Sequence, residues 1–100
     1  MSAMKKAQRG KAEALVQEAE ALLTKKTWFS SSKQQNTEEA AETYERAANA
    51  YKVGGLNQEA GDMYTKAAEL YRDSLTDLNH ASKAFNNAGT LEIEFYVGTT

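Results

Sequence analysis

The sequence contains no cysteine and no proline, and only six of its 100 residues are glycine. Without cysteine the chain can form neither a disulfide nor a thiolate metal site, and nothing requires an oxidising compartment. The lack of proline, together with abundant alanine, glutamate and lysine, favours helix almost throughout. No apolar run reaches the ~20 residues of a membrane span, and the N-terminal segment MSAMKKAQRGKAE lacks the apolar region of a secretory signal. These absences predict one cytosolic helical domain.

The net charge of −2 conceals an uneven distribution. Residues 1–33 carry seven basic and three acidic side chains, whereas residues 34–100 carry five basic and eleven acidic ones. The first part therefore has a net charge of +4 and the second of −6. A basic end can attract anionic lipid or an acidic partner, although a run of charges is also typical of an ordinary solvated helix face.

Apolar spacing and capping signals place the first two helices. The first is expected over residues 3–26, where apolar residues recur three and four positions apart. The second is expected to begin at Asn36, whose side chain can accept hydrogen bonds from free backbone N–H groups, with Glu39 completing a capping box. It should end near Val53, because the two glycines that follow can adopt the left-handed conformation that closes a helix. Residues 27–35 are expected to be irregular.

Two further helices are expected in the second half. Asn57 is predicted to cap the third helix, which should run to about Ser74. The fourth should start near Asp77 or Asn79 and continue at least to Ala88.

An internal repeat organises these helices. The segment EAAETYERAANAYK at 39–52 resembles EAGDMYTKAAELYR at 59–72, at an offset of twenty residues, and ASKAFNNAG at 81–89 is a fainter third copy. Each copy is one helix with an alanine and aromatic stripe, which lets neighbouring helices approach closely. Two such helices have the size of a helical-hairpin repeat. We therefore predict an all-α fold of antiparallel hairpins in a right-handed, tetratricopeptide-like solenoid of about four helices. The residues expected to be buried are Tyr44, Ala47, Ala48, Tyr64, Ala67, Ala68 and Phe85.

The last ten residues, LEIEFYVGTT at 91–100, break this pattern because apolar and polar residues alternate with a strand-like period of two. A single strand has no partner on a helical solenoid. We therefore expect residues 1–90 to form the domain and residues 91–100 to form a loose, divergent tail.

The residues offer little for catalysis, for a cofactor or for a metal. His80 is the only histidine and has no second strong ligand beside it. The glutamates at 38, 39, 42 and 45 complement the start of a helix and are expected to stay hydrated. The tyrosines lie on the predicted core stripes, so packing explains them better than stacking on nucleotides. We expect no enzyme and no nucleic-acid partner.

The segment KKTWFSSSKQQN differs from the rest of the chain. It places Trp28 and Phe29 between two lysines, Lys25 and Lys26, and a polar run that cannot bury apolar area. The aromatic pair can fold back on the helix ends as a plug, or it can contact something outside the protein. An anionic membrane surface would suit the second alternative, because tryptophan favours the lipid interface and each nearby basic group adds ~1 kcal/mol.

The order of these features resembles the soluble NSF attachment proteins. An amphipathic first helix is followed by the aromatic pair in a serine-rich segment, then EEAAETYERAANAYK, AGDMYTKAAELY and ASKAFNNAG. The resemblance covers residues 10–90 and is closest to the N-terminal portion of the alpha type. It implies a curved helical solenoid that coats the SNARE four-helix bundle and recruits the ATPase NSF.

The resemblance also assigns roles to residues. The family's loop between its first two helices dips an aromatic pair into the membrane, which implies a membrane-attachment loop at Lys25, Lys26, Trp28 and Phe29. Basic residues of the concave face meet acidic SNARE surfaces, and Lys52 and Lys66 are the candidates. The family engages NSF through a C-terminal bundle that this sequence lacks, so we expect a fragment, a truncated isoform or an altered gene product.

Two functions are therefore compared. The first is an adaptor, cytoplasmic and peripheral to membranes, that binds SNARE complexes for disassembly by NSF in vesicle trafficking. The alternative is a free-standing helical module that binds proteins or peptides, either tetratricopeptide-like or like the microtubule-interacting-and-trafficking type. That second type joins its first two helices tightly, which disagrees with the long segment around Trp28.

Overall fold

The computed structural model describes the backbone of residues 3–24 and 30–99 and the side chains of residues 3–24 and 33–89. Over these residues it contains four α-helices and one short π-helix. Their bounds are α1 (Ala3–Thr24), α2 (Ser30–Val53), α3 (Asn57–Glu69), the π-helix η1 (Leu70–Ser74) and α4 (Leu78–Thr99). The predicted all-α class is confirmed.

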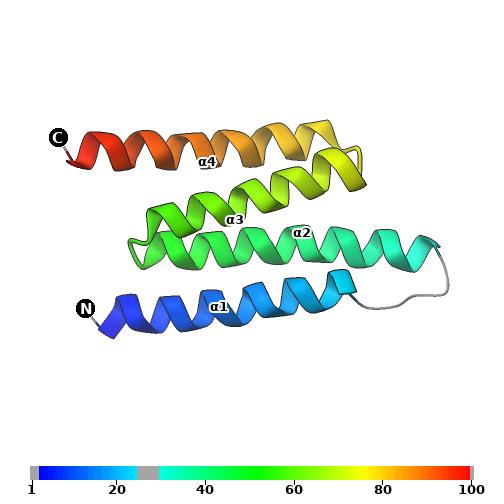
Figure 1. The fold of residues 1–100 in the computed structure, drawn as a ribbon, viewed down its shortest axis with the longest axis horizontal. Coiled ribbons are helices and arrows are strands. Elements are labelled where there is room, and N and C mark those ends of the chain that lie inside the picture. The colour runs from blue at the N-terminus through cyan, green and yellow to red at the C-terminus, as the bar shows by residue number, and fades with distance from the viewer. Residues whose placement is uncertain (1–2, 25–29, 100) are drawn as a thin grey trace.

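The helices lie side by side in chain order, and each runs antiparallel to the one before it (Figure 1). The molecule measures 49 × 28 × 13 Å, and its smallest dimension is close to the ~10–12 Å diameter of one helix with its side chains. Its radius of gyration of 14.3 Å exceeds the ~13 Å of a compact domain of this size. The fold is therefore a single layer, and its antiparallel hairpins confirm that part of the prediction. The right-handed twist of a longer solenoid stays a prediction.

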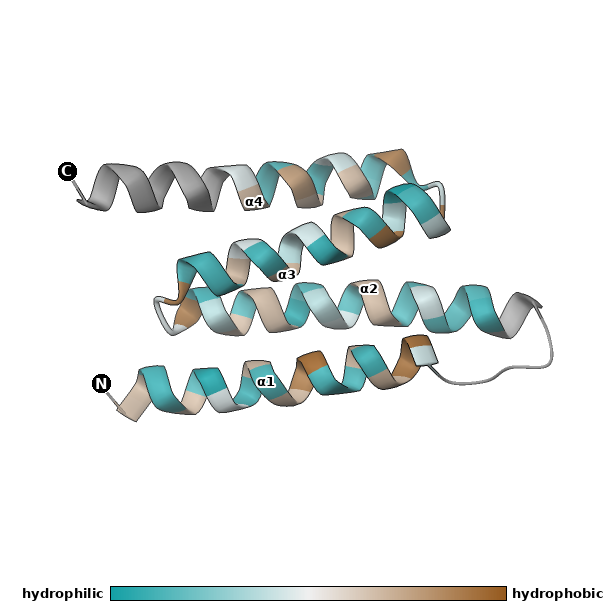
Figure 2. Cartoon of the chain, viewed as in Figure 1, coloured by the Kyte–Doolittle hydropathy of each residue, from teal (hydrophilic) through white to brown (hydrophobic). Residues whose placement is uncertain are grey.

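The core consists almost entirely of alanine and tyrosine. The tyrosines at 44, 51, 64 and 71 retain only 4–8% of their surface, and the alanines around them allow the helices to approach closely. Few stretches in Figure 2 are strongly apolar, because neither residue type ranks high in hydropathy. Six of the seven residues expected in the core are buried, and Phe85 is half-buried.

The core separates into two clusters along the length of the layer. One lies near the α2–α3 turn and includes Ala12, Tyr51, Leu56 and Tyr64. The other lies toward the opposite end and includes Tyr44 and Tyr71, with Ala19, Ala40, Ala41, Ala67 and Ala81. Each cluster thus takes one tyrosine from α2 and one from the next copy of the repeat, Tyr64 in α3 or Tyr71 in η1.

The α2–α3 turn forms as the two glycines predicted. Gly55 has a φ of +78°, its N–H donates to the carbonyl of Lys52 at 3.0 Å, and the N–H of Leu56 donates to that of Tyr51 at 2.8 Å. This pattern closes the C-terminus of a helix. The predicted cap at Asn57 is wrong, because Leu56 occupies the N-cap position without a side-chain hydrogen bond. Burial of Leu56 anchors the turn instead.

The predicted start of α2 is also wrong. The helix begins at Ser30, so Asn36 lies inside it and cannot cap it. The hydroxyl of Thr37 donates to the carbonyl of Lys33 at 2.9 Å, one helical turn earlier. No residue between 30 and 35 is a glycine or a proline, and lysine and glutamine are good helix formers, so nothing ends the helix there.

At the other end of the layer, α3 continues into η1, and the combined helix ends at Ser74 as predicted. The N–H of Leu75 donates to the carbonyl of Leu70 at 3.0 Å, the i to i+5 spacing of a π-helix. Asp77 then caps α4, because its Oδ1 accepts a hydrogen bond from the N–H of His80 at 3.2 Å.

The backbone of residues 91–99 is helical up to Thr99, which the strand-like alternation did not indicate. The division into a domain and a loose tail stays a prediction. A run of alternating residues can form a strand only if a neighbouring strand accepts its hydrogen bonds. No strand is present over residues 3–24 and 30–99, whereas a helix satisfies its own backbone. No break in secondary structure marks the boundary predicted at residue 90.

Candidate functional site

The four residues of the predicted membrane-attachment loop, Lys25, Lys26, Trp28 and Phe29, lie outside the described residues. The helix ends that flank them, Thr24 and Ser30, lie at the same end of the layer as the turn between η1 and α4 (Figure 1). None of the described helices is both long enough and apolar enough to cross a bilayer.

The two predicted partner-binding lysines are both exposed but do not form one cluster. Lys52 lies in the last turn of α2, where its charge complements the helix dipole. The Nζ of Lys66, on α3, lies 5.6 Å from the centre of the Tyr44 ring. Tyr44 precedes Lys52 by eight residues on α2, which corresponds to ~12 Å along the helix.

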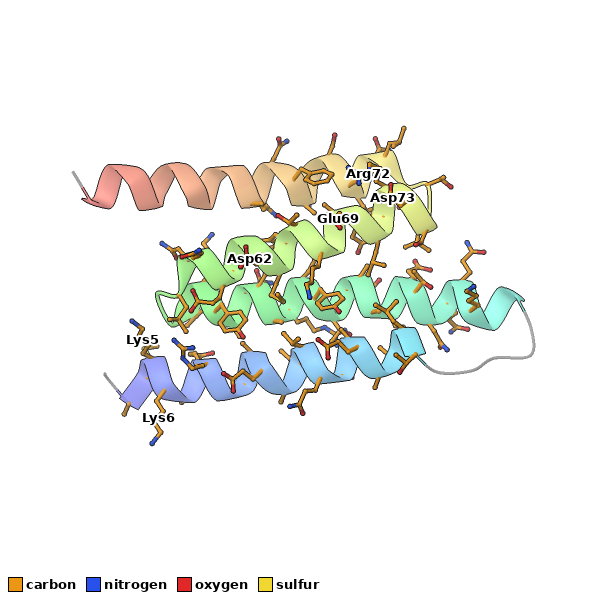
Figure 3. All side chains as sticks on the ribbon, in the orientation of Figure 1. Lys5, Lys6, Asp62, Glu69, Arg72 and Asp73 are labelled. Atoms are coloured by element: carbon orange, nitrogen blue, oxygen red, sulfur yellow. The ribbon has the colours of Figure 1, made fainter. Side chains whose placement is uncertain are left out.

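Charged side chains are distributed unevenly over the layer (Figure 3). Lys5 and Lys6 lie at the start of α1, while Glu69, Arg72 and Asp73 gather where α3 passes into η1. The guanidinium of Arg72 donates to both carboxylate oxygens of Asp73, at 2.7 and 3.0 Å. This hydrogen-bonded pair lowers the pKa of Asp73.

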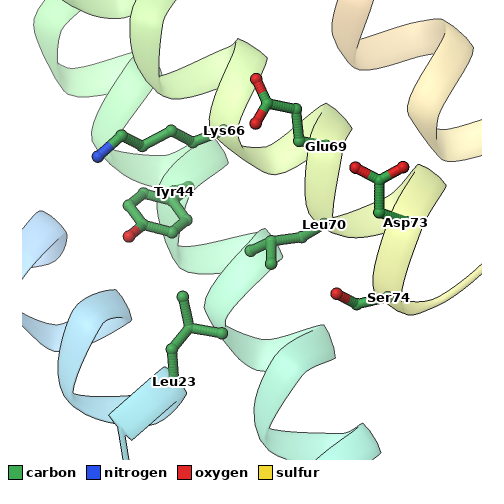
Figure 4. Close-up of a pocket in the computed structure, with 7 residues that line it drawn as sticks. All are labelled: Leu23, Tyr44, Lys66, Glu69, Leu70, Asp73 and Ser74. Carbon is green, nitrogen blue, oxygen red and sulfur yellow. The ribbon is translucent and has the colours of Figure 1, made fainter.

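On one side of the layer, α1 and α3 face each other across α2. Near the α2–α3 turn an ion pair joins these two helices, with Arg9 of α1 lying 3.6 Å from Glu59 of α3. Toward the other end of the layer, a groove of about 290 Å³ lies between α1 and the combined helix of α3 and η1. We name it the mixed-charge groove (Figure 4), and its lining residues are Leu23, Tyr44, Lys66, Glu69, Leu70, Asp73 and Ser74.

The mixed-charge groove has an apolar centre between charges of opposite sign. Leu23 and Leu70 flank the ring of Tyr44, with Lys66 on one side and Glu69 and Asp73 on the other (Figure 4). Leu23 is 41% exposed, so part of its side chain faces solvent in the groove. Burial, followed by the negative charge of Glu20, raises the pKa of Tyr44 above its usual 10.0.

On the other side of the layer, α2 and α4 face each other across α3 and η1. The groove between them is about 110 Å³ and predominantly polar. We name it the acidic groove, and its lining residues are Gln34, Glu38, Glu42, Tyr71, Leu75, Asp77 and His80. Glu42 and Tyr44 are two positions apart on α2, so they project ~160° apart. The two grooves therefore lie on opposite sides of α2.

Three polar residues of the acidic groove, Tyr71, Asp77 and His80, bond to or stack on their neighbours. The hydroxyl of Tyr71 donates to Oε1 of Glu45 at 2.6 Å. The ring of His80 stacks on that of Tyr71 at 5.0 Å, and its Nδ1 lies 2.7 Å from Oδ2 of Asp77. Burial and the hydrogen bond to Glu45 together raise the pKa of Tyr71. Glu45, expected to be hydrated, instead fixes a core tyrosine.

Sequence reasoning identified neither groove. The signal for the first was a stripe that runs from α3 into η1 at positions i, i+3, i+4 and i+7, made of Lys66, Glu69, Leu70 and Asp73. For the second, the tyrosine repeat gave no indication that Glu38, Glu42 and His80 would meet. Among the described residues no three histidine, aspartate or glutamate side chains form a group that could hold a metal ion.

One of the comparisons with known proteins identifies a family. The family model for soluble NSF attachment proteins matches residues 10–94, which includes most of α1, all of α2, α3 and η1, and most of α4. Neither the search of curated proteins nor that of solved structures gave a match. The family match covers the repeat and both grooves, and the chain therefore belongs to the soluble NSF attachment protein family.

Proposed function

We propose that this chain is an adaptor, or the N-terminal part of one, that binds SNARE complexes at the cytoplasmic surface of membranes for disassembly by NSF. The family match over residues 10–94 is the observation that carries the proposal. It favours an adaptor over a free-standing module that binds peptides. NSF would be recruited through a C-terminal region of the family, so SNARE binding and membrane contact are the roles proposed for these residues.

The form of the layer supports this role. A single layer of helices presents both of its sides to solvent, and such an extended surface suits contact with a long bundle at many shallow points. Individual contacts of this kind are weak, and membrane attachment would raise the local concentration of the adaptor around a membrane-anchored SNARE bundle. We therefore expect weak binding in solution and stronger binding on membranes.

Membrane attachment is proposed for Trp28 and Phe29, aided by Lys25 and Lys26. The test is co-sedimentation with anionic liposomes that carry or lack a SNARE bundle. Replacement of both aromatics by serine should reduce binding to liposomes without a SNARE bundle. The matched control replaces Met4 and Val53 by serine, because they are exposed apolar residues, 61% and 56%, outside that segment.

The outcomes separate the two parts of the proposal. If the wild-type chain sediments with SNARE-bearing liposomes no better than with bare ones, the SNARE-adaptor function is wrong. If the aromatic variant binds liposomes as the wild type does, the membrane role of Trp28 and Phe29 is wrong. If that variant unfolds, as judged by circular dichroism, the aromatic pair is a plug on the fold.

A further inference from the structure

The first helix has one side that faces away from the rest of the layer. In Figure 1, α1 lies at the edge of the layer with α2 beside it. Ala12 and Ala19 of α1 are completely buried, so residues on the opposite side of the helix project away from the core. We name these residues, which are all exposed, the outer face of α1: Ala3, Ala7, Gly10, Ala14, Gln17 and Ala21.

The outer face of α1 consists mainly of short side chains, whereas an exposed helix face ordinarily carries charged and polar ones. The other edge of the layer follows that rule, because Ser82, Lys83 and Asn86 of α4 are exposed. A Cβ added at Gly10 meets nothing within 4 Å. A second helix could therefore approach α1 closely, and the charges beside the outer face indicate which helix it is.

The charges of α1 have an order that is unfavourable within the helix itself. Its first half carries four basic residues, and its second half carries three acidic ones: Lys5, Lys6, Arg9 and Lys11, then Glu13, Glu18 and Glu20. The first turn has no acidic residue and the last turn no basic one. A helix dipole favours the reverse order, with carboxylates near the N-terminus and cations near the C-terminus.

Four of these charges flank the outer face of α1 in two sets. Lys6 and Glu20 are 14 positions apart, and Lys11 and Glu18 are seven apart. Both separations are close to a whole number of turns, so each set lies along one flank. All four side chains are exposed, and Lys6 points away from α2 (Figure 3). The described residues give none of the four an ion-pair partner.

A second copy of α1 in antiparallel orientation has the complementary order. In such a pair, each residue lies opposite one on the same flank of the second copy, as far after the centre as it is before it. We propose that the chain forms a symmetric dimer through the outer face of α1, with Ala14 at the two-fold axis. Ala7 and Ala21 are each seven positions from Ala14, so they lie opposite each other.

The same centre brings the charges together. Lys6 precedes Ala14 by eight positions and Glu20 follows it by six, while Lys11 precedes it by three and Glu18 follows it by four. Each lysine therefore lies near a glutamate of the second copy, on both flanks and on both sides of the axis. A parallel pair would instead place Lys6 beside Lys6 and Glu18 beside Glu18.

The dimer would continue the alternation of the layer, because each helix would again run antiparallel to its neighbour. It would also be closed, since both remaining edges would be the polar outer side of α4. One helix from each chain makes a small interface, so we expect weak association. The inference does not depend on the proposed function, and either can fail without the other.

The first experiment is sedimentation equilibrium of the whole chain from about 10 µM to about 1 mM, the range suited to a weak interface. The mass should rise from 11.0 kDa toward twice that value, and high salt should reduce the rise. Ala14→Glu should weaken the dimer at least tenfold, because two carboxylates would meet at the axis. Ser82→Glu is the matched control on α4 and should stay within about twofold of the wild type.

Charge reversal tests the antiparallel pairing. Lys6→Glu/Lys11→Glu and Glu18→Lys/Glu20→Lys should each be monomeric where the wild type dimerises, because like charges would then lie opposite each other. An equimolar mixture of the two should restore the dimer, because every opposed pair regains opposite charges.

A matched control separates this pairing from attraction between net charges. Lys66→Glu/Lys83→Glu changes two exposed lysines outside α1 and has the same net charge as Lys6→Glu/Lys11→Glu. Its mixture with Glu18→Lys/Glu20→Lys should give much less mixed dimer. Circular dichroism should give wild-type helicity for all of these variants, because each changed side chain is exposed.

Cross-linking locates the axis, since the sequence has no cysteine of its own. Under a mild oxidant Ala14→Cys should form a disulfide-linked dimer, because the two copies of residue 14 lie close together at the axis. Ala21→Cys alone should not, because its two copies would lie ~21 Å apart along the helices. A mixture of Ala7→Cys and Ala21→Cys should cross-link to each other.

The alternative outcomes overturn the inference in distinct ways. If the wild-type chain stays at 11.0 kDa up to about 1 mM, there is no dimer. If it dimerises but Ala14→Glu does so equally well, another face forms the dimer. If Trp28→Ser/Phe29→Ser abolishes the dimer, the aromatic pair forms it. If the two charge-reversed variants fail to pair with each other, the antiparallel arrangement about Ala14 is wrong.

Discussion

The two sides of the helical layer carry grooves that are built in the same way and differ in chemistry. In each, two helices flank the tyrosines of the helix between them. Above Tyr44 the groove is larger, about 290 Å³, and contains the exposed Leu23. Its Lys66 and Glu69 carry opposite charges and have no ion-pair partner among the described residues. Above Tyr71 it is about 110 Å³, and a glutamate, an aspartate and a histidine bond to or stack on their neighbours.

The difference shows how one repeat can produce two surfaces of unlike chemistry. Tyr71 has a carboxylate partner within the chain, whereas the described residues give the Tyr44 hydroxyl no hydrogen bond. A polar group that is bonded internally stabilises the fold, and one that is not remains available to another molecule. The following predictions test this contrast, beginning with the change that affects both sides.

Raising the pH should have the largest effect, because burial raises the pKa of Tyr44, Tyr51, Tyr64 and Tyr71 above 10.0. Above pH ~10 the unfolded chain loses phenol protons that the folded chain retains, so the free energy of unfolding decreases as the pH rises. Below pH ~10 this contribution is fully present. Helicity and phenolate absorbance, recorded together from about pH 9 to 12, should show cooperative alkaline unfolding. Ionisation of all tyrosines near pH 10 with helicity intact would contradict the prediction.

Enlarging an alanine between the helices should have the next largest effect. Ala67 is completely buried and packs in the cluster that holds Tyr44 and Tyr71, one from each groove. Ala67→Leu should reduce the free energy of unfolding by about 1–3 kcal/mol, because the helices would have to separate. Ala14→Leu is the control, since Ala14 is exposed on α1, and urea unfolding measures both. Equal curves for the two variants would mean that α3 does not pack closely at Ala67.

Removing the hydroxyl groups compares the two sides directly. Tyr71→Phe should cost about 0.5–1.5 kcal/mol, because the carboxylate of Glu45 loses its donor. Tyr44→Phe should cost less, because the described residues give its hydroxyl no hydrogen bond. Urea unfolding of the two variants and of the double variant gives the difference. A larger loss in the free energy of unfolding for Tyr44→Phe would contradict this contrast, because the Tyr44 hydroxyl would then be the one that stabilises the fold.

A glycine outside both grooves should give the smallest effect and the opposite sign. A Cβ added at Gly10 in α1 meets nothing within 4 Å, so Gly10→Ala should stabilise the chain by about 0.5–1 kcal/mol. Gly55→Ala should destabilise it, because Gly55 has a φ of +78°. The midpoint temperature of thermal unfolding should be higher than that of the wild type for Gly10→Ala and lower for Gly55→Ala. Binding of the SNARE bundle should not change with Gly10→Ala, which touches neither groove.

The sequence predicted the features that depend on local spacing. The repeat identified the buried alanine and tyrosine stripes, and Gly55 marked the end of α2, because both signals lie within a few turns of one helix. Helix boundaries were less predictable where no residue breaks a helix. Asn36 is a good N-cap, but the residues before it also favour helix, so α2 begins earlier.

The grooves could not be predicted in this way, because they depend on which helices lie beside each other. Leu23 and Leu70 are far apart in the sequence and line one groove only because α1 and the combined helix of α3 and η1 flank the same side of α2. The resemblance to soluble NSF attachment proteins was confirmed by the family match. The roles of Trp28 and Phe29, and of Lys52 and Lys66, stay predictions.

The single layer has a consequence for the exchange of backbone amide hydrogens. In Figure 1, α1 and α4 each have one neighbouring helix, whereas α2 and α3 each have two. In a repeat architecture stability is a sum of nearest-neighbour terms, and local opening reflects the number of neighbours. Protection from exchange should therefore be highest in α2 and α3 and decline toward both edges, so that the tyrosine pairs lie in the slowest-exchanging part of the chain.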